Sequence, residues 1–279
     1  MRANIVPLRA MTAGETLDAA VALLRQRALP LLPVALVLAA AEQILLFGMR
    51  DSAGMRPPYY YVPPDFTAGV WWPVVGTGFA VEAFIIALLA AYAGAAAGPA
   101  LLGRDIGHRT LWRRARLLPA AGIALLVAVL CGAAATAGLV LWPLAYTLTA
   151  LATAVLTVDR PANPLVALGR ATGRVVRGGM RGIGILLLGY TTWLVVRVAL
   201  GAGWLEVAEK FADVSPGPWM RWAVPVAWTL ANAVAYTALA CLNAVLLVEI
   251  RIRTEGLDIA VNRARSRGVD PAVALEVNR

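Results

Sequence analysis

The chain has 279 residues, of which 60% are hydrophobic and 15% are charged, and its mean hydropathy is +0.72. Soluble domains carry about 25% charged residues, so this composition excludes an ordinary soluble enzyme, a disordered chain and a nucleic-acid-binding domain. The 25 basic residues exceed the 16 acidic ones, and the basic residues flank apolar runs. We therefore expect an all-α, multi-pass membrane protein that binds no nucleic acid.

The apolar runs predict six membrane spans. A spanning helix needs about 20 mostly apolar residues, and the runs that reach this length are 28–48, 73–101, 117–158, 182–204 and 223–248. As a single helix the third run would reach about 63 Å, roughly twice the hydrocarbon core. We expect it to form a hairpin that turns near residues 137–142, with Pro143 starting the return helix. Six spans place both termini on the same side.

The distribution of arginine predicts which side that is. Of the 25 basic residues, 24 are arginine; 20 basic residues lie on the side of the termini and 4 on the other side. Cytoplasmic loops carry an excess of basic residues, so we expect both termini in the cytoplasm. Six tryptophans fall at the outer ends of spans, where indole rings favour the membrane interface: Trp71, Trp72, Trp142, Trp204, Trp219 and Trp222.

Three regions follow from these runs. Residues 1–27 form a cytoplasmic N-terminal segment, 28–250 the six-span transmembrane domain, and 251–279 a cytoplasmic tail. In the first region Thr12 and Glu15 form a capping-box pattern that starts a helix. Both end regions carry apolar stripes that predict amphipathic helices in the membrane interface: Leu17, Ala20, Val21 and Leu24 in one, and Leu257, Ala260, Val261 and Ala264 in the other. The outer loop, residues 49–70, is rich in Pro and Tyr and is expected to be irregular.

Residues 164–181, before the fifth span, carry the most regular pattern. On a helix, four arginines fall within about 60° of one another: Arg170, Arg174, Arg177 and Arg181. We expect a third interfacial amphipathic helix here. Its basic face either anchors the topology or binds anionic phospholipid head groups or a membrane-protein partner.

Polar residues inside the spans form a second candidate site. Glu42, Glu82 and Arg197 lie at similar depth in the outer half of the bilayer, and Asn232 lies near that level. An unpaired charge at this depth is unfavourable by several kcal/mol, so we expect Arg197 to pair with Glu42, Glu82 or both. The cluster is then a polar lock between helices or a solute or proton pathway. Snorkelling of Arg197 to the interface is a third interpretation.

Shorter features add smaller expectations. Gly94 and Gly98 form a GxxxG pattern that favours close packing inside the bundle. Residues 25–30 (RQRALP) and 114–119 (RARLLP) are similar, and each precedes a span running from inside to outside, as in a repeat of parallel hairpins. Cys131 and Cys241 lie in apolar runs, so we expect no disulfide.

No pattern of a catalytic nucleophile or phosphate-binding loop is found, and the chain has one histidine. We therefore expect no enzyme, no metal site and no cofactor. The segments PLRAMTAGETLDAAVALLRQR, VALGRATGRVVRGGMRGIGILLLGY and EIRIRTEGLDIAV resemble the multi-pass membrane domain of some bacterial glycerophosphoryl diester phosphodiesterases. The resemblance implies a bacterial plasma-membrane protein similar to stand-alone actinobacterial copies without assigned activity. The histidine pair and acidic metal ligands of the phosphodiesterase domain have no counterpart, so no catalytic residue carries over.

Two functions remain from the sequence. The leading expectation is a non-enzymatic scaffold or accessory subunit that contacts anionic lipid or a membrane-protein partner through its arginine faces. The alternative is a small-solute or ion transporter or channel that uses Glu42, Glu82 and Arg197. A transporter requires a water-accessible cavity that reaches the acidic residues, whereas a scaffold does not.

Overall fold

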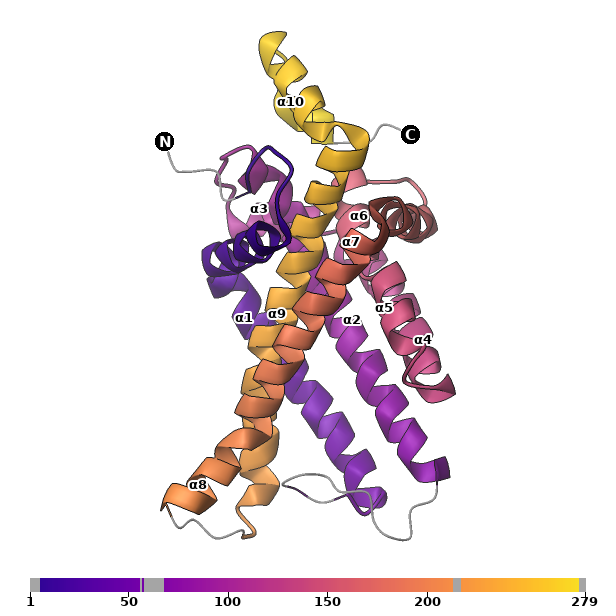
Figure 1. Ribbon diagram of the computed structural model, residues 1–279, viewed down its shortest axis with the longest axis vertical. Coiled ribbons are helices and arrows are strands. Elements are labelled where there is room, and N and C mark those ends of the chain that lie inside the picture. Colours follow the sequence, from indigo (N-terminus) through magenta and orange to yellow (C-terminus); the bar gives the residue numbers. More distant parts are fainter. Residues whose placement is uncertain (1–5, 56, 58–67, 213–216, 276–279) are drawn as a thin grey trace.

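A computed structural model of the chain describes residues 6–55, 57, 68–212 and 217–275. Five of its helices are long and apolar enough to cross a membrane. They are α1 (Ala13–Ser52), α2 (Ala68–Leu101), α4 (Leu117–Ala137), α7 (Pro164–Val198) and α9 (Met220–Glu255). They form a bundle whose two chain ends lie at one end (Figure 1). We call this the terminal end and the opposite one the distal end. The fold has the helices of a multi-pass membrane protein.

The hairpin predicted within residues 117–158 is present, but its return limb is not one long helix. After α4 the chain turns, and α5 (Trp142–Thr149) begins with Pro143 in its first turn. A second short helix, α6 (Ala152–Asp159), continues the limb. The hydroxyl of Thr149 donates to the carbonyl of Ala145 at 2.7 Å, and bonds of this kind bend helices. Because the return segment is divided into the two short helices α5 and α6, it is not among the five long helices.

Helix α9 is the centre of the bundle. It is buried along most of its length and packs against α1, α2 and α7, while α2 also packs against α4 and α6. A Cβ atom on Gly94 of α2 would lie 2.9 Å from the Cα atom of Ala154 in α6, and one on Gly98 would lie 2.9 Å from Leu275. The GxxxG motif therefore packs inside the chain, as its spacing predicted.

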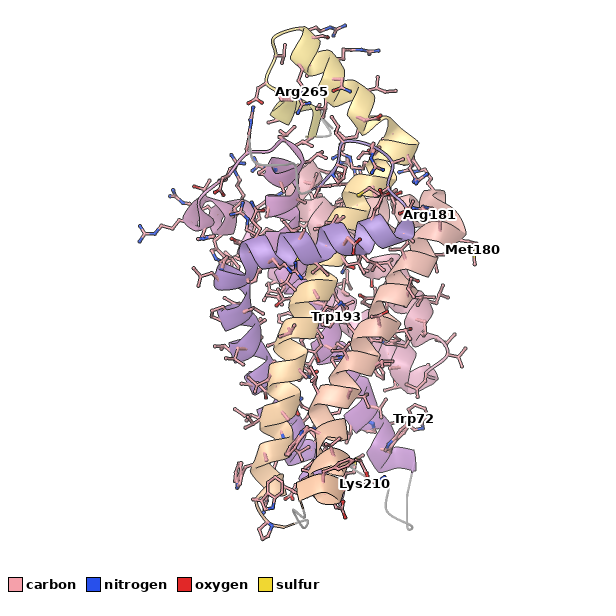
Figure 2. The ribbon with its side chains drawn as sticks, turned by 60° about the vertical axis from the view of Figure 1, so that its left-hand side comes forward. Trp72, Met180, Arg181, Trp193, Lys210 and Arg265 are labelled. Atoms are coloured by element: carbon pink, nitrogen blue, oxygen red, sulfur yellow. The ribbon has the colours of Figure 1, made fainter. Side chains whose placement is uncertain are left out.

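Two of the long helices bend near the terminal end. Helix α1 leaves helical geometry at Arg27 (φ −113°, ψ 15°), and its first part lies across the bundle end (Figure 2). Helix α7 bends at Gly179 (φ 61°, ψ −158°), a conformation that favours glycine. The predicted capping box of Thr12 and Glu15 is confirmed.

The apolar stripe of the first part of α1 faces protein, where an interfacial helix was expected. Ala20 and Leu24 are buried in the main core, and Leu17 packs against it. The tail helix α10 (Leu257–Ser266) follows Gly256, which has a positive φ, and extends beyond the bundle (Figure 1). Leu257 and Val261 of its stripe are buried, whereas Ala260 is exposed.

Three arginines at the terminal end each contact the segment that returns to this end in the same hairpin: Arg27 at the bend of α1, Arg116 directly before α4, and Arg181 just after the bend of α7. These contacts are Arg27 with Asp105 (3.3 Å), Arg116 with the carbonyl of Pro161 (3.1 Å), and Arg181 with Glu249 (3.5 Å). Arg27 and Arg116 occupy equivalent positions in the similar sequences 25–30 and 114–119. The weak internal repeat thus corresponds to a recurring contact that closes each hairpin.

The expectations for the distal surface are met only in part. Trp222 is 67% exposed, as an interfacial residue would be, but Trp142 is only 6% exposed. Trp142 instead packs with the rings of Phe79, Tyr146 and Tyr190. The expectation of an interfacial Trp142 was wrong because the start of α5 lies inside the bundle. Half of the expected outer loop 49–70, at residues 56 and 58–67, lies outside the described residues, and its two ends, 49–52 and 68–70, belong to α1 and α2.

Candidate functional site

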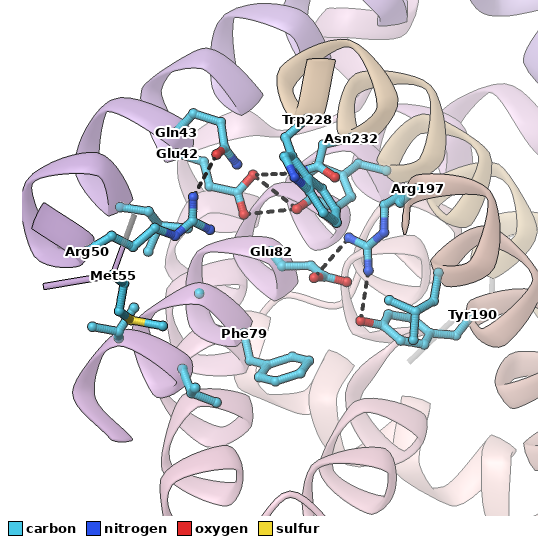
Figure 3. A pocket seen from close by; sticks show the side chains of 16 residues that line it. Glu42, Gln43, Arg50, Met55, Phe79, Glu82, Tyr190, Arg197, Trp228 and Asn232 are labelled. Atoms are coloured by element: carbon cyan, nitrogen blue, oxygen red, sulfur yellow. Dashed lines mark hydrogen bonds and ion pairs between the residues drawn. The ribbon is translucent and has the colours of Figure 1, made fainter. Parts of the chain in front are cut away.

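Four helices bring the predicted intramembrane cluster together in the distal half of the bundle. Glu42 comes from α1, Glu82 from α2, Arg197 from α7 and Asn232 from α9. All four residues are at most 7% exposed, and their side chains line one cavity (Figure 3). The depths predicted from the sequence, by counting residues along each span separately, had placed these four residues at a similar level, and the structure brings them together there.

Within the cluster, Glu82 and Arg197 form a balanced ion pair. Arg197 Nη1 lies 3.0 Å from Glu82 Oε2, and Arg197 Nη2 donates to the Tyr190 hydroxyl at 3.1 Å. The guanidinium carbon also lies 5.5 Å from the ring centre of Tyr190 and 5.3 Å from that of Tyr236, within the range of cation–π attraction. This pair has the geometry of the polar lock and joins α2 to α7.

Glu42 has a different environment. The Tyr236 hydroxyl donates to its carboxyl oxygens at 2.9 and 3.0 Å, and Asn232 Nδ2 donates at 3.2 Å. Among the described residues, no basic side chain lies within 4.0 Å of this carboxyl group. A buried carboxylate without a nearby cation is unfavourable by several kcal/mol. Glu42 is therefore suited to hold a proton, or to hold a cation that replaces it.

The cavity beside Glu42 has a volume of about 280 Å³. It extends from Glu42 and Glu82 to Arg50 and Met55 near the distal end of α1. Arg50 donates to Gln43 Oε1 at 3.0 Å (Figure 3). Aromatic side chains make up much of the remaining wall: Phe79, Tyr190, Trp228 and Tyr236. The lining also holds Arg197, which balances Glu82, and Arg50, which contacts Gln43, so the Glu42 carboxyl group and the aromatic rings are what favour a small cation or polar solute.

An irregular helical turn follows Arg197 and packs against Trp228, a residue that lines the cavity. The π-helix η1 (Ala199–Gly203) joins α7 to α8 (Trp204–Ala212). A Cβ atom on Gly201 would lie 2.6 Å from the Trp228 ring, so glycine is needed for this close packing. Turns of this type are common at functional sites.

The four arginines of α7 occupy a separate network at the terminal end. Arg174 is 3% exposed; its Nη1 lies 2.6 Å from Asp159 and its Nε 2.8 Å from Glu255. Arg170 and Arg251 each lie 3.7 Å from Asp159. Arg174, which is buried and paired, has no surface to offer a lipid head group or a partner.

The other two members of this face are also paired within the chain. Arg177 lies 4.0 Å from Glu255. Arg181 lies 3.5 Å from Glu249 and donates to the Met11 carbonyl at 2.5 Å. Arg170, Arg174 and Arg181 of the predicted common face are therefore turned toward carboxylates from α6 and α9, while the Arg177 side chain is 61% exposed. These contacts fasten the bent part of α7 to the bundle, which differs from the expected helix free in the interface.

Sequence reasoning missed two kinds of residue. The tyrosines were not singled out, although Tyr236 lies four residues after Asn232 and Tyr190 seven before Arg197, spacings that share a helix face. The acidic partners Asp159, Glu249 and Glu255 were also missed. Their position in the sequence could have pointed to them, because each lies near the end of a helix that returns to the terminal end, α6 or α9.

No family model, curated protein or solved structure matches this chain. The resemblance to the membrane domain of glycerophosphoryl diester phosphodiesterases therefore stays a prediction. The function proposed below depends on the geometry of the cavity.

Proposed function

We propose that the chain crosses a bacterial plasma membrane six times, with both termini in the cytoplasm. Helices α5 and α6 would form the fourth crossing. Together they cover residues 142–159, which at 1.5 Å per residue reach about 27 Å and approach the thickness of the hydrocarbon core. The excess of arginine at the terminal end supports this orientation.

The topology can be tested by cysteine labelling. Cys131 and Cys241 are both 0% exposed, so a membrane-impermeant maleimide should report mainly on introduced cysteines. We expect Ser266→Cys in α10 to react only after the membrane of intact cells is opened, and Glu209→Cys in α8 to react without opening. The opposite pattern would reverse the proposed orientation.

We propose that the protein is a transporter that exchanges a small cation for a proton in the cavity beside Glu42. When the cation binds, the proton on the Glu42 carboxyl passes to water in the cavity, and the carboxylate then balances the cation. The observation that carries this proposal is a cavity of about 280 Å³ that reaches a buried carboxyl group without a basic partner among the described residues. Glu82 stays with Arg197 and holds the helices in place.

The scaffold hypothesis has less support from the geometry. Its main candidate surface was the basic face of α7, and Arg174, Arg177 and Arg181 pair with carboxylates of the same chain. A scaffold also has no need of a cavity beside buried acidic groups. Co-purification of a stoichiometric partner, with no ion movement by the purified protein, would favour the scaffold.

A flux assay tests the transporter proposal. The protein is reconstituted in vesicles that contain a pH-sensitive dye, and tetramethylammonium is added outside as the probe cation. Inward movement of the cation should drive protons out and raise the internal pH. We expect Glu42→Gln to abolish this change, because an amide cannot release a proton in this range.

The matched control is Glu209→Gln, which removes a carboxyl group from an exposed position in α8. It should transport like the wild type. Equal loss in both variants, or a folded wild-type protein that moves no protons with tetramethylammonium, sodium or potassium, would refute the proposal.

A further inference from the structure

A second pocket, of about 420 Å³, lies at the terminal end between the α3–α4 corner and the α6–α7 connection. Helix α3 spans His108–Arg114. Four arginines dominate the lining: Arg113, Arg114, Arg116 and Arg160. Thr110 also lines it, whereas no described acidic residue does. Guanidinium groups and a hydroxyl are the donors that proteins use to bind phosphate.

The pocket gathers several arginines without a carboxylate beside them. Some arginines elsewhere at this end do pair with carboxylates, as Arg27 does with Asp105 and Arg104 with Asp270. Within the described part of the chain, Arg113, Arg114 and Arg116 form no ion pair. Their positive charge is therefore not neutralised by the protein.

The backbone places two of these arginines in an unusual way. Arg116 (φ 51°, ψ 57°) precedes α4 and Arg160 (φ 51°, ψ 48°) follows α6. They are the only non-glycine residues with positive φ in the described ranges, and both line this pocket. Side chains other than glycine rarely adopt this conformation. The fold thus keeps two arginines where glycine would be expected.

Apolar residues lie directly beside the pocket. Leu117 and Leu118, in the first turn of α4, are 44% and 89% exposed. Helix α4 is one of the five helices able to cross a membrane, so these leucines suit contact with lipid chains. A phosphate held by Arg116 would have an apolar surface next to it.

We propose that this pocket binds a phosphate group, and that an anionic phospholipid supplies it. The arginines hold the phosphate, and the acyl chains lie along the exposed leucines of α4. In this proposal the lipid contact is the pocket and not the expected face of Arg170, Arg174, Arg177 and Arg181. The pocket is also separate from the distal cavity beside Glu42.

The test is a titration of the delipidated protein in neutral detergent, read by native mass spectrometry. The probes are phosphatidylglycerol, phosphatidylcholine and inorganic phosphate. The test variant is Arg113→Gln/Arg114→Gln, which changes two exposed side chains and leaves the Arg116 contact to Pro161 in place. The matched control, Arg263→Gln/Arg265→Gln, removes the same charge from exposed positions of α10.

We expect the wild type to bind phosphatidylglycerol in preference to phosphatidylcholine. The test variant should bind phosphatidylglycerol at least about tenfold more weakly, because each arginine near an anionic lipid contributes about fivefold. The control should bind like the wild type. Inorganic phosphate should compete only at far higher concentration; competition at equal concentration would support the phosphate site but make a soluble phosphate its ligand. No preference for phosphatidylglycerol, or an equal loss in the control, would overturn the proposal.

Discussion

The protein buries charge in two places, and the two differ in how completely the charge is balanced. At the terminal end Asp159 contacts Arg170, Arg174 and Arg251. In the distal half, Glu82 has Arg197, but Glu42 has only neutral donors and faces a cavity. The balanced charges fasten helices together, whereas the unbalanced carboxyl group has room for a ligand. The paired charges therefore have a structural role, and Glu42 is the group suited to a functional one.

The largest effect is expected from breaking the network around Asp159. Asp159→Asn would remove the carboxylate that three guanidinium groups share, leaving Arg174 and Arg251 buried with less compensation. We expect the free energy of unfolding to fall by about 3–5 kcal/mol, the usual range when one partner of a buried pair is lost. Denaturant titration in detergent, followed by tryptophan fluorescence, measures it. Asp18→Asn, at an exposed position of α1, should change stability little; an equal loss there would remove the distinction.

A smaller loss is expected at the distal ion pair. Glu82→Gln would leave the buried Arg197 charge with only the Tyr190 hydroxyl and two aromatic rings, so we expect a loss of about 3 kcal/mol. Adding Arg197→Gln should restore part of the stability, because the uncompensated charge is then removed. If Glu82→Gln folded with wild-type stability but lost transport, Glu82 would belong to the pathway and not to the lock.

Glu42→Gln should affect stability much less. A protonated carboxyl group and an amide are similar in shape, and both can accept the hydrogen bond from Tyr236. We expect the free energy of unfolding to stay within about 1 kcal/mol of the wild type. A loss as large as that of Glu82→Gln would mean that Glu42 is ionised and structurally required.

The smallest effect concerns an exposed pair that serves as a reference for the buried ones. Hydrogen bonds from Arg104 and from the Ala272 backbone hold the pKa of Asp270 below its ordinary value of 3.8. A lowered pKa means that the contact is present at neutral pH and is lost as the pH falls through that lowered value. A spin label at Val273→Cys should become more mobile in acid. In Asp270→Asn it should already be more mobile at neutral pH; identical mobility would show that the pair does not hold the tail.

The sequence predicted the depth of Glu42, Glu82 and Arg197 because distance along a spanning helix is set by residue number. It could not predict which carboxyl group forms the ion pair with Arg197, or that a cavity lies beside Glu42, because both depend on how four helices are rotated and packed. The common face of the α7 arginines was visible, but the direction of that face depended on Asp159 and Glu255 from other helices. The hairpin turn was signalled by Pro143, whereas the break before α6 lacks Gly or Pro.

The protonation of Glu42 is the central claim, and dicyclohexylcarbodiimide tests it most directly. This reagent reacts with protonated carboxyl groups in apolar surroundings, and peptide mass spectrometry locates the adduct. The folded protein should be modified at Glu42 at neutral pH, faster as the pH falls, and not at the ion-paired Glu82. Glu42→Gln should remove the adduct. An unmodified Glu42, or equal modification of Glu42 and Glu82, would contradict the account.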